Sequence, residues 1–124
     1  MICYDANVIL EILFDRPKSD ACSALIYKTD EKLATTMVSV SIIMYYAERN
    51  KADIRYTERF LRQFIWLPVT ESDGEWAFQN YGVEDYEDGL QIACAIRENC
   101  KKFVTLDQAL AKKYAQNIPI SLIN

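Results

Sequence analysis

The stretch Ile2-Cys3-Tyr4-Asp5-Ala6-Asn7-Val8-Ile9-Leu10-Glu11-Ile12-Leu13 contains a predicted strand and a predicted helix separated by a polar break. The apolar run Ile2–Tyr4 predicts a short buried strand. Residues 5–7 interrupt this run, and the apolar residues from Val8 to Leu13 predict a helix. A strand that leads directly into a helix is the repeating unit of α/β proteins, so we expect the unit to recur along the chain.

Strands and helices alternate from this unit to the C-terminus. The predicted strands are Ile2–Tyr4, Leu33–Val38, Ile65–Val69, Phe103–Thr105 and Ile118–Leu122. The predicted helices are 8–13, 19–28, 39–49, 53–64, 72–79, 85–99 and 107–115, with Ser39 or Ser41 as the cap of the third. Pro68 indicates that the strand beginning at Ile65 is short or lies at an edge. This alternation predicts an α/β fold with a mainly parallel sheet between two layers of helices.

The composition is that of one globular domain covering residues 1–124. The hydrophobic share is 51% and the charged share 26%, which is ordinary for a soluble protein. The longest apolar stretches, Val38–Ala47 and Gly89–Ile96, are well short of the ~20 residues that a membrane-spanning helix needs. No basic leader precedes Asp5, so no signal peptide is predicted. We therefore expect a cytoplasmic protein without a membrane partner.

The side chains that are missing restrict the chemistry. The chain has no histidine, which removes the usual general base and the usual nucleophilic triads. Its four cysteines form no CxxC pair, so a structural zinc site is not expected. Cys94 lies in a strongly apolar run and is predicted to be a small buried hydrophobe. Any chemistry must then come from carboxylates, hydroxyls, lysine or a metal ion.

Three aspartates are predicted to meet at one edge of the sheet. Asp5 follows the first strand, Asp107 follows the strand Phe103–Thr105, and Asp88 lies in the first turn of the preceding helix. Ligands of open parallel sheets bind outside the carboxyl ends of the strands, which is where these residues fall. Each aspartate also has a purely structural explanation, because Asp5 and Asp107 can cap helices and Asp88 can complement a helix dipole. The combination of the three favours a functional site.

Three short motifs resemble the PIN domain family over essentially the whole chain. The opening Tyr4-Asp5-Ala6-Asn7-Val8-Ile9-Leu10 followed by Asp15-Arg16-Pro17 is similar to the start of PIN domains. The stretch Asp85-Tyr86-Glu87-Asp88-Gly89-Leu90-Gln91-Ile92-Ala93 resembles the segment with the family's third acid, and Val104-Thr105-Leu106-Asp107 resembles its Thr-x-Asp element. The resemblance implies a PIN-like three-layer α/β/α fold and a metal-dependent nuclease. Small PIN domains of this kind are mostly VapC-type toxins of toxin–antitoxin pairs.

The resemblance also implies roles for particular residues. Asp5, Asp88 and Asp107 would be the acidic cluster that binds metal and supports catalysis, with Asn7 close behind Asp5. Thr105 would hydrogen-bond a ligand carboxylate or the attacking water. Oxygen ligands without histidine suit Mg²⁺ or Mn²⁺. Such a site would hydrolyse RNA phosphodiester bonds.

The chain departs from the family pattern in the helix after the second strand. PIN domains usually place a glutamate near the start of that helix, but the segment Ser39–Tyr46 contains no acid. Glu48 is the only acid in the sequence from Ser39 to Ala52, and it comes about one helical turn later than the family pattern leads one to expect. It either reaches the metal site as a fourth ligand or is a solvated surface residue. The departure puts full activity in doubt.

The net charge of −4, with a pI of about 4.8, argues against a nucleic-acid partner on average charge alone. Local cations can still contact RNA phosphates, and Arg16, Lys18 and Lys112 are the candidates near the expected site. Ordinary solvated surface positions explain these residues equally well. The family resemblance implies an antitoxin protein as partner. It also makes a homodimer as well supported as a monomer.

Two other functions remain open from the sequence. A catalytically degenerate PIN-like domain would bind RNA or a protein partner without cleaving, and the missing helix glutamate favours it. A flavodoxin-like phosphoacceptor domain also gathers acids at strand ends. No lysine directly follows Val104-Thr105, and the first acid comes too early for that class.

Overall fold

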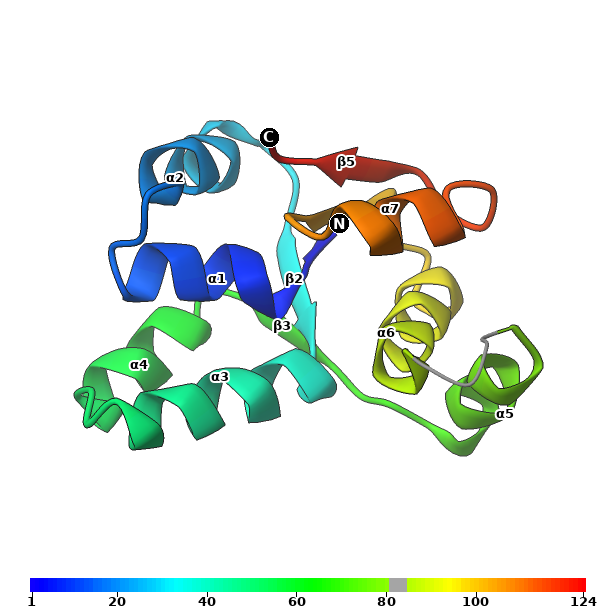
Figure 1. The fold of residues 1–124 in the computed structure, drawn as a ribbon, viewed down its shortest axis with the longest axis horizontal. Coiled ribbons are helices and arrows are strands. Elements are labelled where there is room, and N and C mark those ends of the chain that lie inside the picture. The colour runs from blue at the N-terminus through cyan, green and yellow to red at the C-terminus, as the bar shows by residue number, and fades with distance from the viewer. Residues whose placement is uncertain (81–84) are drawn as a thin grey trace.

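The computed structural model describes residues 1–80 and 85–124, and in these residues a five-stranded parallel sheet forms the centre of the fold (Figure 1). The strands are β1 (Ile2–Tyr4), β2 (Leu33–Thr36), β3 (Ile65–Leu67), β4 (Lys102–Thr105) and β5 (Ile120–Leu122). Their order across the sheet is β3-β2-β1-β4-β5, so β1 is central and β3 is an edge strand. The edge position of β3 is the one that Pro68 predicts.

Helices cover both faces of the sheet, which makes the fold the three-layer α/β/α arrangement expected from the sequence. The helices are α1 (Ala6–Leu13), α2 (Ser19–Lys28), α3 (Met37–Arg49), α4 (Ile54–Leu61), α5 (Glu71–Asn80), α6 (Tyr86–Arg97) and α7 (Gln108–Tyr114). Figure 1 shows α1 to α4 on one side of the sheet and α5 to α7 on the other. The prediction of the fold class is therefore confirmed.

Strand β1 shows why two cores form. Ile2 and Tyr4 point into the core under α1 to α4, whereas Cys3 between them points into the core under α6 and α7. Successive side chains of a strand face opposite sides of a sheet, so an uninterrupted apolar strand needs a cover on each face. All three residues are buried, with Cys3 fully inaccessible.

The boundary between β2 and α3 differs from the prediction. The strand ends at Thr36 rather than Val38, and Met37 already belongs to the helix. The cap is Thr36, whose hydroxyl oxygen accepts a hydrogen bond of 3.2 Å from the backbone N–H of Ser39, so the predicted caps Ser39 and Ser41 are wrong. The threonine hydroxyl satisfies an otherwise unpaired N–H of the first helical turn, which fixes the helix start there.

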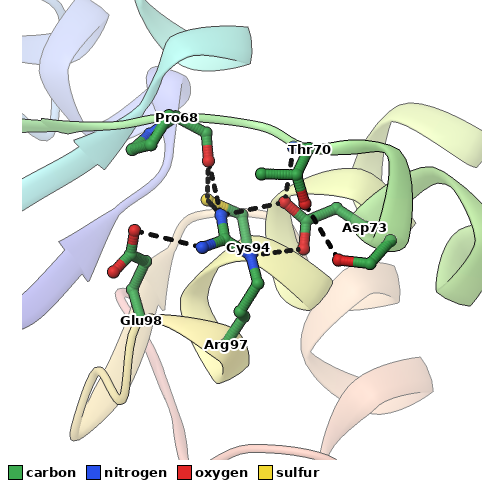
Figure 2. A network of polar contacts seen from close by, with 7 residues as sticks. Pro68, Thr70, Asp73, Cys94, Arg97 and Glu98 are labelled. Carbon is green, nitrogen blue, oxygen red and sulfur yellow. Dashed lines mark hydrogen bonds and ion pairs between the residues drawn. The ribbon is translucent and has the colours of Figure 1, made fainter.

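Helices α5 and α6 pack closely, and an ion pair ties them together (Figure 2). A Cβ at Gly89 would lie only 3.1 Å from the Cβ of Ala77, so glycine permits this close approach. Near the other end of α6, the guanidinium of Arg97 donates to both oxygens of Asp73, at 3.0 and 3.1 Å. Asp73 also accepts the backbone N–H of Thr70, and its side chain is only 2% exposed.

The sequence also predicts that Cys94 is buried and that the chain has no membrane-spanning helix. All four cysteines are buried and free, and Cys94 is fully inaccessible, as a small core residue would be. Within residues 1–80 and 85–124, none of the helices combines the length and the apolar character that crossing a bilayer requires.

Candidate active site

Asp5 lies where β1 ends, in the middle of the sheet. Its backbone N–H donates to the carbonyl of Val104 at 2.9 Å, so the carboxyl ends of β1 and β4 are side by side. The residue occupies the N-cap position of α1, but its carboxylate makes no capping hydrogen bond. The side chain is therefore held by other partners, and only 6% of the residue is exposed.

Thr105 and Asn7 orient the Asp5 carboxylate. The hydroxyl of Thr105 donates to Oδ2 of Asp5 at 2.8 Å, and the amide of Asn7 donates to the same oxygen at 3.2 Å. The Asn7 carbonyl oxygen in turn accepts the backbone N–H of Leu106 at 3.2 Å. These bonds connect α1 to the end of β4 and restrict rotation of the carboxylate, as expected for a side chain that must present its oxygens in a fixed direction.

Gln91 on α6 is a partner of Asp5 that sequence reasoning missed. Its amide nitrogen donates to Oδ1 of Asp5 at 3.4 Å, and its carbonyl oxygen accepts the hydroxyls of Thr36 and Ser39. The side chain is almost fully buried. The available signal was a single amide within the apolar run Leu90–Ile96, because a buried amide needs nearby polar partners.

A surface cleft of about 310 Å³ opens over this network. Its acidic wall consists of Asp5, Glu87, Asp88 and Asp107, so the three predicted aspartates lie around one cleft. Asp107 also caps α7, accepting the backbone N–H of Leu110 at 3.1 Å through Oδ1. Asp107 therefore has a structural role as a helix cap and also lines the cleft.

Burial and nearby negative charges raise the pKa values of two acids of this wall, Asp5 and Asp88. Burial raises the pKa of Asp5, against the hydrogen bonds from Thr105, the Ala6 backbone and Gln91 that lower it. The pKa of Asp88 is raised to about 7, first by burial and then by the negative charges of Asp5 and Asp107. The cleft therefore favours a proton or another cation near Asp88.

The opposite wall contains apolar and basic residues. Leu10, Arg16, Ile42 and Tyr46 line it, and the last two come from α3. Ile42 thus occupies the part of α3 where the family pattern leads one to expect an acid. Arg16 is the one predicted RNA-contacting residue among those that line the cleft.

The other predicted site residues lie outside the cleft. Glu48 is exposed on α3 and does not line it. Lys18 and Lys112 are exposed as well, and neither contributes to the lining. The backbone N–H of Lys18 donates to the buried carboxylate of Glu11 at 2.9 Å, which anchors the start of α2.

The oxygen atoms around the cleft are of the type that binds a hard divalent cation. They are carboxylate oxygens, as Mg²⁺ and Mn²⁺ prefer, and the raised pKa of Asp88 shows that a positive charge would relieve repulsion there. In residues 1–80 and 85–124, however, no three acids or cysteines are already close enough together to hold an ion. The residues therefore fit such an ion by chemistry, and the carboxylates must approach one another to bind it.

Asp88→Asn is expected to stabilise the metal-free protein more at pH 8 than at pH 5. Asp88 binds its proton more tightly in the folded state, so its favourable contribution is complete below pH ~4 and is lost as the pH rises through about 7. With allowance for solvent screening of a half-buried group, we expect a gain of about 1–2 kcal/mol at pH 8. Urea unfolding in EDTA at both pH values measures it, with Glu87→Gln as the control. An equal effect of Asp88→Asn at both pH values would contradict the prediction.

The sequence matches one family model, described as PIN domain, over residues 2–116. No protein of curated function matches the sequence.

Several solved structures share the fold. A toxin–antitoxin complex from Klebsiella pneumoniae contains a chain with a TM-score of 0.78 and 17% identity, covering 98% of this chain and 96% of that one. A chain of VapBC2 from Rickettsia felis, bound to a DNA fragment from its promoter, has a TM-score of 0.72 and 14% identity, with complete coverage of both chains. A chain of FitAcB from Neisseria gonorrhoeae has a TM-score of 0.72 and 20% identity, and the match covers 97% of this chain and 96% of that one. At such low identities, the likeness establishes the fold.

Proposed function

The chain belongs to the PIN domain family, and from this premise we propose that it is an Mg²⁺- or Mn²⁺-dependent endoribonuclease and the toxin of a type II toxin–antitoxin pair. The observation that carries the proposal is the acidic wall on which Asp5, Asp88 and Asp107 surround one cleft at the carboxyl ends of the central strands. This is the edge of an open parallel sheet at which ligands bind.

Asp5 and Asp88 are the proposed metal ligands, with Asp107 as a further ligand or as the residue that orients water. A bound divalent ion supplies Lewis-acid stabilisation of charge on the phosphodiester and lowers the pKa of water. The chain's own residues prepare the site. Thr105, Asn7 and Gln91 hold the Asp5 carboxylate in one orientation, and burial excludes bulk water from it.

The charge state of the wall supports a role for a cation. Burial, and then the negative charges of Asp5 and Asp107, raise the pKa of Asp88 to about 7, so this carboxyl is partly protonated at neutral pH. The ionised form of Asp88 would be favoured by a divalent cation held at the acidic wall. The overall negative charge is compatible with an RNA substrate if the metal neutralises the acids next to the phosphate and Arg16 contacts the chain beside it.

The solved complexes support the toxin part of the proposal. The structures from Klebsiella pneumoniae and Rickettsia felis are of a toxin–antitoxin complex and of VapBC2, respectively. By analogy, this chain would be inhibited by an antitoxin protein encoded with it. The analogy rests on fold likeness and on family membership.

A second candidate function is favoured by the lining from α3. Ile42 and Tyr46 face the cleft where a fourth acid would be expected, and Glu48 lies outside it. A site with fewer carboxylates binds a divalent ion less tightly. A catalytically degenerate domain that binds RNA or a protein partner would have this arrangement.

Incubation of a mixed RNA substrate with the purified chain and Mn²⁺ or Mg²⁺ tests the proposal. We expect cleavage that EDTA abolishes and that added Mn²⁺ restores, because the acids alone do not activate water. Asp5→Asn purified in parallel controls for a contaminating nuclease. Absence of cleavage with both metals, or cleavage that persists in EDTA, would reject the metal-dependent nuclease and favour the degenerate domain.

A further inference from the structure

The cleft has two walls of different chemistry, and the proposed hydrolysis gives no role to the aromatic and aliphatic residues of the second wall. The opposite wall contains the aromatic ring of Tyr46, the aliphatic side chains of Ile42 and Leu10, and Arg16. Tyr46 remains 41% exposed although it borders the carboxylates. A flat, accessible ring beside a phosphate-cleaving centre is the kind of surface on which a nucleobase stacks.

Tyr46 contacts a second aromatic residue on α3, which in turn contacts a basic one. The rings of Tyr45 and Tyr46 pack edge to face with their centroids 5.4 Å apart. The guanidinium of Arg49 lies 5.6 Å from the Tyr45 ring centroid and donates to the Tyr45 hydroxyl at 3.1 Å. These contacts restrict the rings before any ligand binds, so little side-chain entropy remains to be lost on binding.

A second pairing of a cation with a ring involves Arg16, which lines the cleft together with Tyr46. The guanidinium of Arg16 is 5.4 Å from the ring centroid of Phe14. Arg16 and Arg49 are both exposed, although the chain as a whole carries a net charge of −4. One guanidinium thus contacts the tyrosine pair and another lines the cleft with Tyr46, although the net charge of the chain is negative. Exposed rings together with guanidinium groups suit a polymer that alternates planar bases with phosphates.

We infer that Tyr46, supported by Tyr45 and Arg49, forms a base-stacking subsite for single-stranded RNA next to the proposed cleavage centre. The inference rests on the proposed function for the placement of the scissile phosphate at the acidic wall. A base adjoining that phosphate stacks on Tyr46, and Arg16 contacts a neighbouring phosphate. Paired bases present no free face to the ring, so the subsite selects unpaired strands.

The test measures RNA binding separately from cleavage. The parent protein is Asp5→Asn in EDTA at low salt, and the probe is a fluorescein-labelled RNA of adenine and cytosine, which does not pair with itself. We expect Tyr46→Ala to raise Kd by about tenfold or more, as the loss of one base–aromatic stack does. Tyr46→Phe keeps the ring and should bind within about twofold of the parent, since stacking does not need the hydroxyl. Tyr27→Ala, at an exposed tyrosine on α2 outside the cleft, should bind like the parent.

A second readout reports stacking directly. Replacing single adenines of the probe with 2-aminopurine should give fluorescence quenching on binding to the parent and to Tyr46→Phe, and no such quenching with Tyr46→Ala. DNA of the same sequence and the RNA annealed to its complement should both bind more weakly. Arg16→Gln should reduce the salt dependence of binding by about one phosphate contact, a slope change of ~0.7 for a single strand.

Three outcomes would overturn the inference: no binding of the RNA by the parent, equal binding by Tyr46→Ala, or equal loss in Tyr46→Phe. The first would assign the exposed aromatic surface to a protein partner. The failures of the two proposals are distinguishable. Ring-dependent binding without wild-type cleavage rejects the nuclease and keeps the subsite, whereas wild-type cleavage with unchanged binding by Tyr46→Ala does the reverse.

Discussion

Asp5→Asn is expected to lower the rate of metal-dependent RNA cleavage by at least about a hundredfold, because it removes a proposed metal ligand whose charge would be worth several kcal/mol of transition-state stabilisation. Asp5 is the acid at the centre of the network, since three side chains donate to its carboxylate. Asparagine has the same shape and can still accept from Thr105. It carries no negative charge and therefore binds a divalent cation poorly.

The fold should survive this substitution, which makes the loss of cleavage interpretable. The asparagine amide would face the donor nitrogen of Gln91, so one weak hydrogen bond of 3.4 Å is lost. Against this loss, removal of a buried charge is favourable, as the raised pKa of Asp5 indicates. The measurement is the initial cleavage rate in Mn²⁺, together with a thermal melt in EDTA. A rate within about tenfold of wild type would remove Asp5 from the metal site.

Thr105→Val tests whether the orientation of Asp5 matters as well as its charge. It deletes the hydroxyl, which donates to Asp5 at 2.8 Å and accepts the backbone N–H of Asp107 at 3.0 Å, and it keeps a β-branched side chain. The expected loss of metal affinity is about 10–100-fold, which is typical of partners that orient a ligand. A titration of the melting temperature with Mn²⁺ measures it without relying on activity.

Much of the acidic wall could be predicted because it depends on short-range pattern. An apolar strand followed by an aspartate places that aspartate at the carboxyl edge, as Asp5 and Asp107 show. The parallel order then brings the ends of β1 and β4 together, since these strands are neighbours. Asp88 joins them because α6 begins at the same edge of the sheet, as first-turn acids in an α/β fold often do.

The opposite wall depends on how helices rotate about their axes, which the sequence does not specify. On α3, the apolar residues are numerous enough that several rotations would bury a stripe, so Ile42 and Tyr46 could not be assigned to the cleft beforehand. Gln91 was hidden for a related reason, because its partners Thr36 and Ser39 come from another part of the chain. Strand β2 ends early because the side chain of Thr36 caps α3. The β-branched residues around Thr36 favour a longer strand, so the sequence did not indicate this cap.

Arg97→Ala is expected to destabilise the protein by about 3 kcal/mol, because it leaves the carboxylate of Asp73 buried without its cation. The side chain of Asp73 is 2% exposed, and both of its oxygens accept from Arg97. Figure 2 shows Arg97 between Asp73, Glu98 and the carbonyl of Pro68, so one guanidinium joins α6 to the segment that leads into α5. The melting temperature should fall by roughly 10 °C for a domain of this size.

A double-mutant cycle separates the ion pair from the loss of packing. In the Arg97→Ala background, Asp73→Asn removes the unpaired charge and should restore part of the lost stability, whereas in the wild type the same change is destabilising. Lys101→Ala breaks an exposed pair with Glu31 and should lower the stability far less than Arg97→Ala does. Additive effects of the Arg97 and Asp73 substitutions would show that the pair contributes no coupling energy.

The consequence for the cleft follows from the position of Arg97 on the same helix as Asp88 and Gln91. Gly89, next to Asp88, packs against Ala77 on α5, so α5 supports the start of α6 as well as its end. Loosening this helix pair should displace Asp88 and Gln91 before it unfolds the sheet, because β1 and β4 are held by their own ladder. Arg97→Ala should therefore weaken Mn²⁺ binding at temperatures where circular dichroism still reports a folded protein. Metal affinity equal to wild type under those conditions would mean that the two ends of α6 are not coupled.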